Sequence, residues 1–146
     1  MILNLQNISI EDLMKGYQLQ HLHYKCIHCE KTFFIHEVYS TDNKLLNAEG
    51  MVQLHIVQEH ESPFHALLQL DKKISGLSEV QQEMLKLFYE GVADQDIVEQ
   101  SSVNSISTVR QHRFKLREKE RQAKIFLALM QLVSEPSQYK IHKGAK

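Results

Sequence analysis

Two stretches decide the fold of the N-terminal half: YKCIHCEKTF at residues 24–33 and VQLHIVQEH at residues 52–60. The first carries Cys26 and Cys29, the only two cysteines among the 146 residues, and the second carries His55 and His60. Two thiolates and two imidazoles form the tetrahedral ligand set that Zn²⁺ prefers. All four positions belong to the protein, which leaves no open place for the water of a catalytic zinc. The pattern therefore predicts a structural zinc site.

The residues around these four ligands resemble a C2H2 zinc finger. An aromatic residue stands two positions before the first cysteine, at Tyr24, and another four after the second, at Phe33, while apolar Val52 precedes the first histidine by three. The resemblance implies a ββα segment. Between Cys29 and His55 lie 25 residues, about 13 more than in a typical finger, and we expect the extra length to form a longer hairpin.

Two alternatives to this ligand set stay open. The chain has 9 histidines, so the cysteines can be free thiols beside incidental imidazoles. His28, His36 or His65 can also replace one of the four ligands. His28 is the weakest substitute, because it lies between the cysteines and its side chain should point away from them.

Residues 48–60 form a predicted helix that we do not expect to enter DNA. The helix has no Lys or Arg and contains Glu49 and Glu59, and phosphates repel acidic groups. We expect this helix to hold the N-terminal fold together or to contact a protein partner. The other elements expected in this half are helices over 9–17 and 62–70 and strands over 33–39 and 44–46.

The C-terminal half has the capping and apolar pattern of three helices. Ser78 and Gln81 form a capping box, and Gly91 marks the end of the first helix. Asp94 is the expected cap of a short second helix. A third helix begins near Ser105 or Ser107 and directs Val109, Leu116 and the second helix's Ile97 toward a shared core.

Residues 77–119 resemble the helix-turn-helix of the LuxR/GerE family of bacterial regulators. The matching segments are LS at 77–78, ExLxL at 83–87, EG at 90–91, DIVEQ at 96–100 and STVRQH at 107–112. The resemblance implies a DNA-binding regulator whose third helix reads the major groove. Arg113 departs from the pattern, since it stands where the family buries an apolar residue, and this departure leaves the exact set of base contacts open.

Charge is concentrated on that third helix, although the net charge of the whole chain is only −1. Residues 108–124 contain 7 Lys and Arg against 2 Asp and Glu, whereas residues 1–76 contain 6 against 9. Such a local excess suits a phosphate backbone, and the alternative is an ordinary solvated helix face. The residues expected to bind DNA are Ser107, Thr108, Arg110, Gln111, His112, Arg113, Lys115 and Arg117.

Residues 125–133 are more apolar than one exposed side of a helix should be. They include Ile125, Phe126, Leu129 and Met130. One interpretation packs this segment against the N-terminal domain. The other makes it a homodimer interface, which would place two recognition helices on two half-sites of DNA.

The expected fold is mainly α: a zinc-finger-like ββα segment with flanking helices, then a helix-turn-helix and a long terminal helix. The expected domains are a zinc-binding domain at 1–71, a linker at 72–76, a DNA-binding domain at 77–135 and a basic tail at 136–146. The predicted function is sequence-specific transcriptional regulation on double-stranded DNA. The alternative is a zinc-stabilised adaptor that binds protein. The sequence shows no recognisable catalytic motif, membrane span or secretion signal, so we expect a cytoplasmic protein that is not an enzyme.

Overall fold

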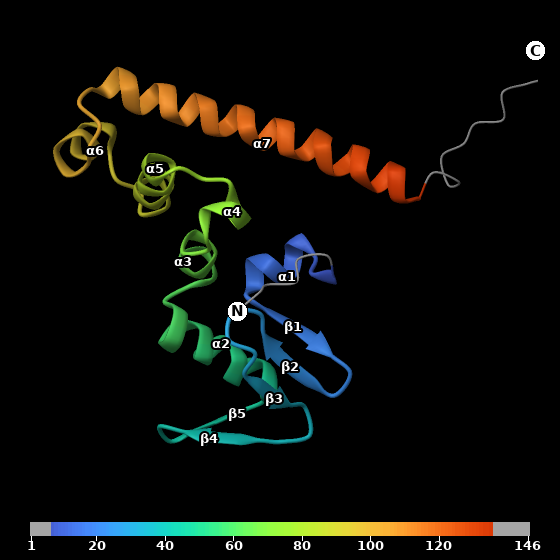
Figure 1. Cartoon of the computed structure of the whole chain (residues 1–146). Coiled ribbons are helices and arrows are strands. Elements are labelled where there is room, and N and C mark those ends of the chain that lie inside the picture. Colours follow the sequence, from blue (N-terminus) through green and yellow to red (C-terminus); the bar gives the residue numbers. More distant parts are fainter. Residues whose placement is uncertain (1–6, 136–146) are drawn as a thin grey trace, which may run out of the picture. The chain divides into compact units, whose positions relative to one another are not determined.

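The computed structural model describes residues 7–135, so the predicted basic tail at 136–146 lies outside the described residues. The chain divides into two compact units, Met1–Leu77 and Ser78–Lys146, and each is described by itself. Among residues 7–135, strands occur only in the first unit, and the regular structure of the second unit is entirely helical (Figure 1).

The first unit begins with helix α1 (Ile10–Lys15), which is shorter than the helix expected over 9–17. Ser9 caps it as expected, by accepting a hydrogen bond from the Asp12 amide. Gly16 ends it with a φ of 87°, a backbone conformation that favours glycine. Tyr17 therefore leaves the helix and begins the first strand.

Three antiparallel strands follow: β1 (Tyr17–Gln20), β2 (His23–Cys26) and β3 (Thr32–Phe34). The two aromatic residues that flank the cysteines, Tyr24 and Phe33, are direct partners across β2 and β3. Strands β1 and β2 could not be predicted, because residues 18–25 show no clean alternation of apolar and polar side chains.

The expected strand over 33–39 is wrong as one element. Its ends belong to two different sheets, because β3 stops at Phe34 and β4 (Tyr39–Thr41) pairs only with β5 (Lys44–Leu46). The chain turns between them, where the Glu37 amide donates to the Phe34 carbonyl at 3.1 Å. The extra length inside the finger-like segment therefore forms a second, separate hairpin, β4–β5, and does not lengthen the first one.

Helix α2 (Ala48–His60) packs along the sheet and completes the ββα segment (Figure 1). Its buried side chains Ala48, Val52 and Ile56 form one core with strand residues, namely Tyr17, Cys26 and Phe33. The Tyr17 hydroxyl donates to Glu49 at 2.9 Å and accepts from Gln53 Nε2 at 3.1 Å. These bonds hold α2 against β1.

Two short helices complete this unit. Helix α3 (Pro63–Leu68) begins at a proline after the cap Ser62, as the sequence indicates. Helix α4 (Lys72–Ser75) occupies most of the residues expected to form a linker, because Asp71 caps it at one end and Gly76 ends it at the other.

The second unit contains α5 (Glu79–Tyr89), α6 (Asp94–Gln100) and α7 (Ile106–Ser134). The capping box of Ser78 and Gln81 is confirmed, and Ser105 caps α7. The expected cap at Asp94 is wrong: Ala93 holds that position, and the Asp94 carboxylate binds Arg113 instead.

The core of this unit joins all three helices. Met84 and Leu87 of α5, Ile97 of α6 and Val109 of α7 are buried together, and Leu116 packs against them, as the sequence indicates. The turn before α7 is fastened to α5, because the Ser102 amide and hydroxyl both donate to the Glu83 carboxylate, at 3.2 and 2.8 Å.

The predicted fold class is confirmed: the chain is mainly helical, with small N-terminal sheets and a long helix at its C-terminal end. Among the described helices, none is long and apolar enough to cross a lipid bilayer.

Candidate metal centre and basic helix face

The structure brings the four predicted metal ligands together. The ligand atoms of Cys26, Cys29, His55 and His60 all lie within 4.8 Å of one another. The Sγ of Cys26 is 3.5 Å from Nε2 of His60, and the Sγ of Cys29 is 3.0 Å from Nε2 of His55. Tetrahedral zinc with its usual bond lengths places a sulfur and a nitrogen about 3.6 Å apart, so the cluster fits this ion.

Local backbone structure presents the two thiols. Cys26 ends β2, and the chain reverses after it: the Glu30 amide donates to the Cys26 carbonyl, and the Cys26 amide donates to the Lys31 carbonyl. Glu30 has a positive φ of 65°, which closes this knuckle. The Ile27 amide donates to the Gly16 carbonyl at 3.1 Å, so the end of α1 supports the knuckle.

The two imidazoles come from the last turns of α2. His55 is only 6% exposed and its ring lies 5.9 Å from the ring of Phe33, between centroids. His60 ends the helix, and its ring lies 5.2 Å from that of His55. Residues five apart are not stacked on an ideal helix, but both side chains reach the same cluster here.

The burial of the cluster shifts the pKa of two ligands. Burial, reinforced by His60 and Lys31, lowers the pKa of His55 and favours the neutral imidazole that binds metals. Burial raises the pKa of the Cys26 thiol, so the unbound thiol is neutral. A divalent cation supplies the positive charge that turns such a thiol into a thiolate ligand.

His28 is placed differently from the expectation that it points away from the knuckle. Its ring lies 5.6 Å from the ring of His60, between centroids, so the side chain faces the end of α2. Within the described residues, its Nε2 is buried without a hydrogen-bond partner. His28 is outside the four-residue cluster, as are His36 and His65.

The eight residues expected to bind DNA all lie within residues 107–117, near the start of α7. Five of them are exposed: Ser107, Arg110, Gln111, Lys115 and Arg117. They stand opposite or beside the buried stripe of Val109 and Leu116. The remaining three are half-buried: Thr108, His112 and Arg113.

Arg113 is held inside the second unit. Its guanidinium donates two hydrogen bonds to Asp94, at 2.8 and 3.2 Å, and lies 4.4 Å from the centre of the Phe88 ring. The LuxR/GerE resemblance places an apolar residue at this position. Arg113 occupies it instead, with its planar guanidinium over an aromatic ring. Arg113 thereby joins α5, α6 and α7.

One exposed residue of this helix face was missed by the sequence analysis. Phe114 is 61% exposed and lies on the same side as Gln111 and Arg110, one turn further along. The available signal was its spacing of five from Val109, which excludes it from the buried stripe.

Comparisons with protein-family models, curated proteins and solved structures found no match to this chain. The resemblance of residues 77–119 to the LuxR/GerE family therefore stays a prediction that rests on the motifs themselves.

Proposed function

We propose that the chain is a sequence-specific DNA-binding transcriptional regulator with a structural zinc site. The observation that carries the proposal is the exposed face at the start of α7, which presents Arg110, Gln111, Lys115 and Arg117. This face lies opposite a stripe that α5 and α6 bury. A helix fixed on one side and basic on the other suits the DNA major groove.

The arrangement of α6 and α7 supports a helix-turn-helix. A 7-residue helix is followed by a short turn and a helix whose start is capped by Ser105. Two of the LuxR/GerE motifs, DIVEQ at 96–100 and STVRQH at 107–112, fall on these same elements. We infer that α7 is the recognition helix and that α6 lies across the DNA backbone.

The exposed side chains divide by chemistry. The Arg110 guanidinium can bridge O6 and N7 of guanine, and the Gln111 amide can bridge N6 and N7 of adenine. Ser107 and Thr108 stand in the first turn, where a helix favours a phosphate. We assign Arg113 to positioning α7, because two of its N–H groups are bound to Asp94 and its guanidinium lies over the Phe88 ring.

The zinc site has a structural role in this proposal. Cys26 and Cys29 fix the knuckle between β2 and β3, and the two histidines fasten α2 to it. The unit has a small core, and zinc bound by such a set contributes directly to folding. The acidic α2 makes this unit a poor second reader of DNA, so we place DNA contact on the second unit.

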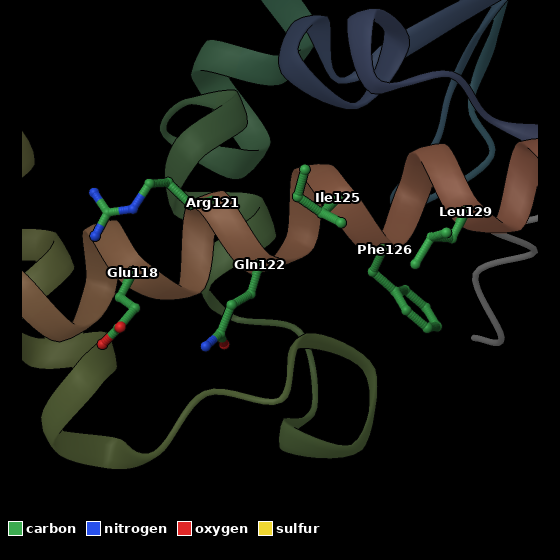
Figure 2. A pocket seen from close by; sticks show the side chains of 6 residues that line it. All are labelled: Glu118, Arg121, Gln122, Ile125, Phe126 and Leu129. Atoms are coloured by element: carbon green, nitrogen blue, oxygen red, sulfur yellow. The ribbon is translucent and has the colours of Figure 1, made fainter.

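We further propose that two copies associate through the distal part of α7. Residues 125–134 contain no charged side chain, and seven large apolar residues there are 40–71% exposed. Ile125, Phe126 and Leu129 help to line a shallow pocket of about 450 Å³ on this helix. Figure 2 shows these side chains on α7. Lys124 precedes this segment and Glu135, the C-cap of α7, follows it, so the segment has a positive charge at one end and a negative charge at the other. Antiparallel pairing sets Lys124 against Glu135 of the partner subunit.

The test is recovery of fragmented genomic DNA by the zinc-loaded protein at about 0.15 M salt. We expect a few sites to be enriched and Arg110→Ala to lose them, with Lys44→Ala as a control that removes one positive charge from β5. Recovery of all sequences equally, or of none, contradicts sequence-specific binding.

A protein-binding adaptor is the second candidate, and exposed apolar residues in the first unit favour it. Leu22, Phe34 and Ile35 are 42–50% exposed, and the Ile35 amide donates to the Leu22 carbonyl, so these residues adjoin. Salt separates the two candidates: phosphate binding weakens steeply as salt rises, whereas an apolar protein interface does not.

A further inference from the structure

Phe114 is an aromatic side chain on an otherwise polar helix face. It is 61% exposed, and its helical neighbours one turn away are Arg110, Gln111, Arg117 and Glu118, all exposed. The core of the second unit draws on Val109 and Leu116 from the opposite side of α7. Phe114 therefore contributes little to the folded core, and its apolar surface is available to a ligand.

The edges of bases in the major groove are polar with one exception. They present hydrogen-bond donors and acceptors, and the 5-methyl group of thymine is their only apolar feature. Burying a methyl group under a phenyl ring contributes favourable binding free energy. Covering a hydrogen-bond donor or acceptor does not, because the ring cannot pair with it. The side chain thus selects one base of the four.

We propose that Phe114 is a specificity-determining residue that contacts the 5-methyl group of thymine in the bound site. The inference rests on the proposed function, since it requires α7 to lie in the major groove. It deepens that function by naming which base the centre of the helix face selects.

The spacing on α7 also places this thymine relative to a second base. Gln111 precedes Phe114 by three residues, or about 4.5 Å along the helix axis, and adjacent base pairs are about 3.4 Å apart. The two side chains therefore reach the same or neighbouring base pairs. The site should contain an adenine for Gln111 within one step of the thymine for Phe114.

Deoxyuridine tests this contact, because it pairs as thymine does and lacks only the methyl group. Each thymine of the most enriched genomic site is replaced singly by deoxyuridine, and Kd is measured at fixed salt. We expect one position to weaken binding by the wild-type protein about fourfold, the value of one buried methyl group. In Phe114→Ala, substitution at that position should change Kd no further.

The control is Leu45→Ala, which removes an apolar side chain that is 76% exposed on β5, in the unit to which we assign no DNA contact. This variant should still bind about fourfold more weakly when deoxyuridine replaces thymine at that position. Phe114→Leu, which retains an apolar side chain, should keep part of this effect. Because Phe114 is exposed, far-ultraviolet circular dichroism of the variants should match the wild type.

The outcomes separate this inference from the proposed function. If no genomic site is enriched, both fall. If sites are enriched and deoxyuridine never changes Kd, or if Phe114→Ala keeps the deoxyuridine penalty, DNA binding stands and the role of Phe114 is overturned.

Discussion

The two cysteines differ in exposure although they share one knuckle. Cys26 is buried at the end of β2, whereas Cys29 is exposed. Burial raises the pKa of Cys26, so an unbound Cys26 is a neutral thiol inside the core. The same position is well suited to a metal ion, because a bound thiolate there is protected from water. Cys26 is therefore the more informative of the two to replace.

Cys26→Ser should release zinc and unfold the first unit. Structural zinc in finger peptides contributes about 10–16 kcal/mol, as much as the whole stability of a small domain. The measurements are zinc content per chain and hydrogen–deuterium exchange of peptides from residues 7–77. The helices of the second unit should keep their protection, because their core is separate.

His36→Ala is the control for this replacement, since it removes an imidazole outside the cluster. It should retain one zinc per chain and leave exchange unchanged. A Cys26→Ser protein that keeps both its zinc and its protection would show that the four residues do not form the site.

The ion pair of Arg113 and Asp94 takes the place of the apolar packing expected at position 113. Hydrogen bonds from Arg113 lower the pKa of the Asp94 carboxyl. In the unfolded chain the pKa of an aspartate carboxyl is about 3.9. Its lowered pKa in the folded state stabilises the fold fully above that pH, and the contribution is lost as the pH falls through the folded-state pKa. The stability of the second unit should therefore fall below about pH 4.

Arg113→Gln should lower the stability of the second unit by roughly 0.5–1 kcal/mol, because it loses contact with the Phe88 ring. The value is small since 43% of the Arg113 side chain is exposed and solvent screens its charge. Urea unfolding at pH 6 and pH 3 measures both effects. The difference between wild type and variant should shrink at pH 3.

Arg117→Gln removes the same charge from the exposed pair with Glu120 and is the matched control. It should change stability by less than about 0.5 kcal/mol at both pH values. Equal effects of the two variants would contradict the positioning role of Arg113.

Among the elements, those with a local signal could be predicted and those without could not. Caps at Ser9, Ser62, Ser78 and Ser105 are short-range hydrogen bonds, and the sequence shows them directly. Strands β1 and β2 depend on pairing with each other and on the core beneath them. No residue pattern within 18–25 contains that information.

The candidate site divides in the same way. The four metal ligands could be predicted because cysteine and histidine at finger-like spacing have few other uses. The positions of His28 and Arg113 could not, because each depends on a neighbour distant in sequence: His60 for one, Asp94 for the other. Tertiary contact decided both.

The junction between α1 and β1 depends on Gly16. Its φ of 87° disfavours any side chain, and a Cβ there would lie 3.0 Å from Cδ1 of buried Ile56. Gly16→Ala should therefore destabilise the first unit by more than about 1 kcal/mol, the usual cost of a left-handed alanine. Hydrogen–deuterium exchange of α1 and α2 peptides in zinc-loaded protein measures the change.

Gly91→Ala measures the cost of a left-handed backbone conformation alone, without the contact with Ile56. Gly91 has a φ of 72°, and nothing lies within 4 Å of a Cβ placed there. Its effect on α5 peptides should be about 1 kcal/mol and smaller than that of Gly16→Ala. If the two substitutions cost the same, contact with Ile56 adds nothing at Gly16.

For the whole molecule, the proposed dimer gives a direct prediction. Leu129 is 55% exposed in the middle of the charge-free segment of α7. Leu129→Asp should place a charge inside the interface and shift the protein to monomers, as measured by sedimentation velocity. Leu45→Asp, at an exposed position of β5, should leave the sedimentation coefficient unchanged. A wild-type protein that is monomeric at about 100 times the protein concentration used for DNA binding contradicts the dimer.

The uninterrupted α7 has a mechanical consequence. From Leu116, its last residue packed on the core, to Ser134 the helix rises about 27 Å as a stiff rod. In the proposed dimer, this length sets the distance between the recognition residues and the interface. Seven residues inserted after Lys124 would move the distal segment outward by about 10 Å and keep its rotational phase, whereas two would rotate it by roughly half a turn. The seven-residue insertion should change the preferred spacing between DNA half-sites. The two-residue insertion should prevent the two copies from associating.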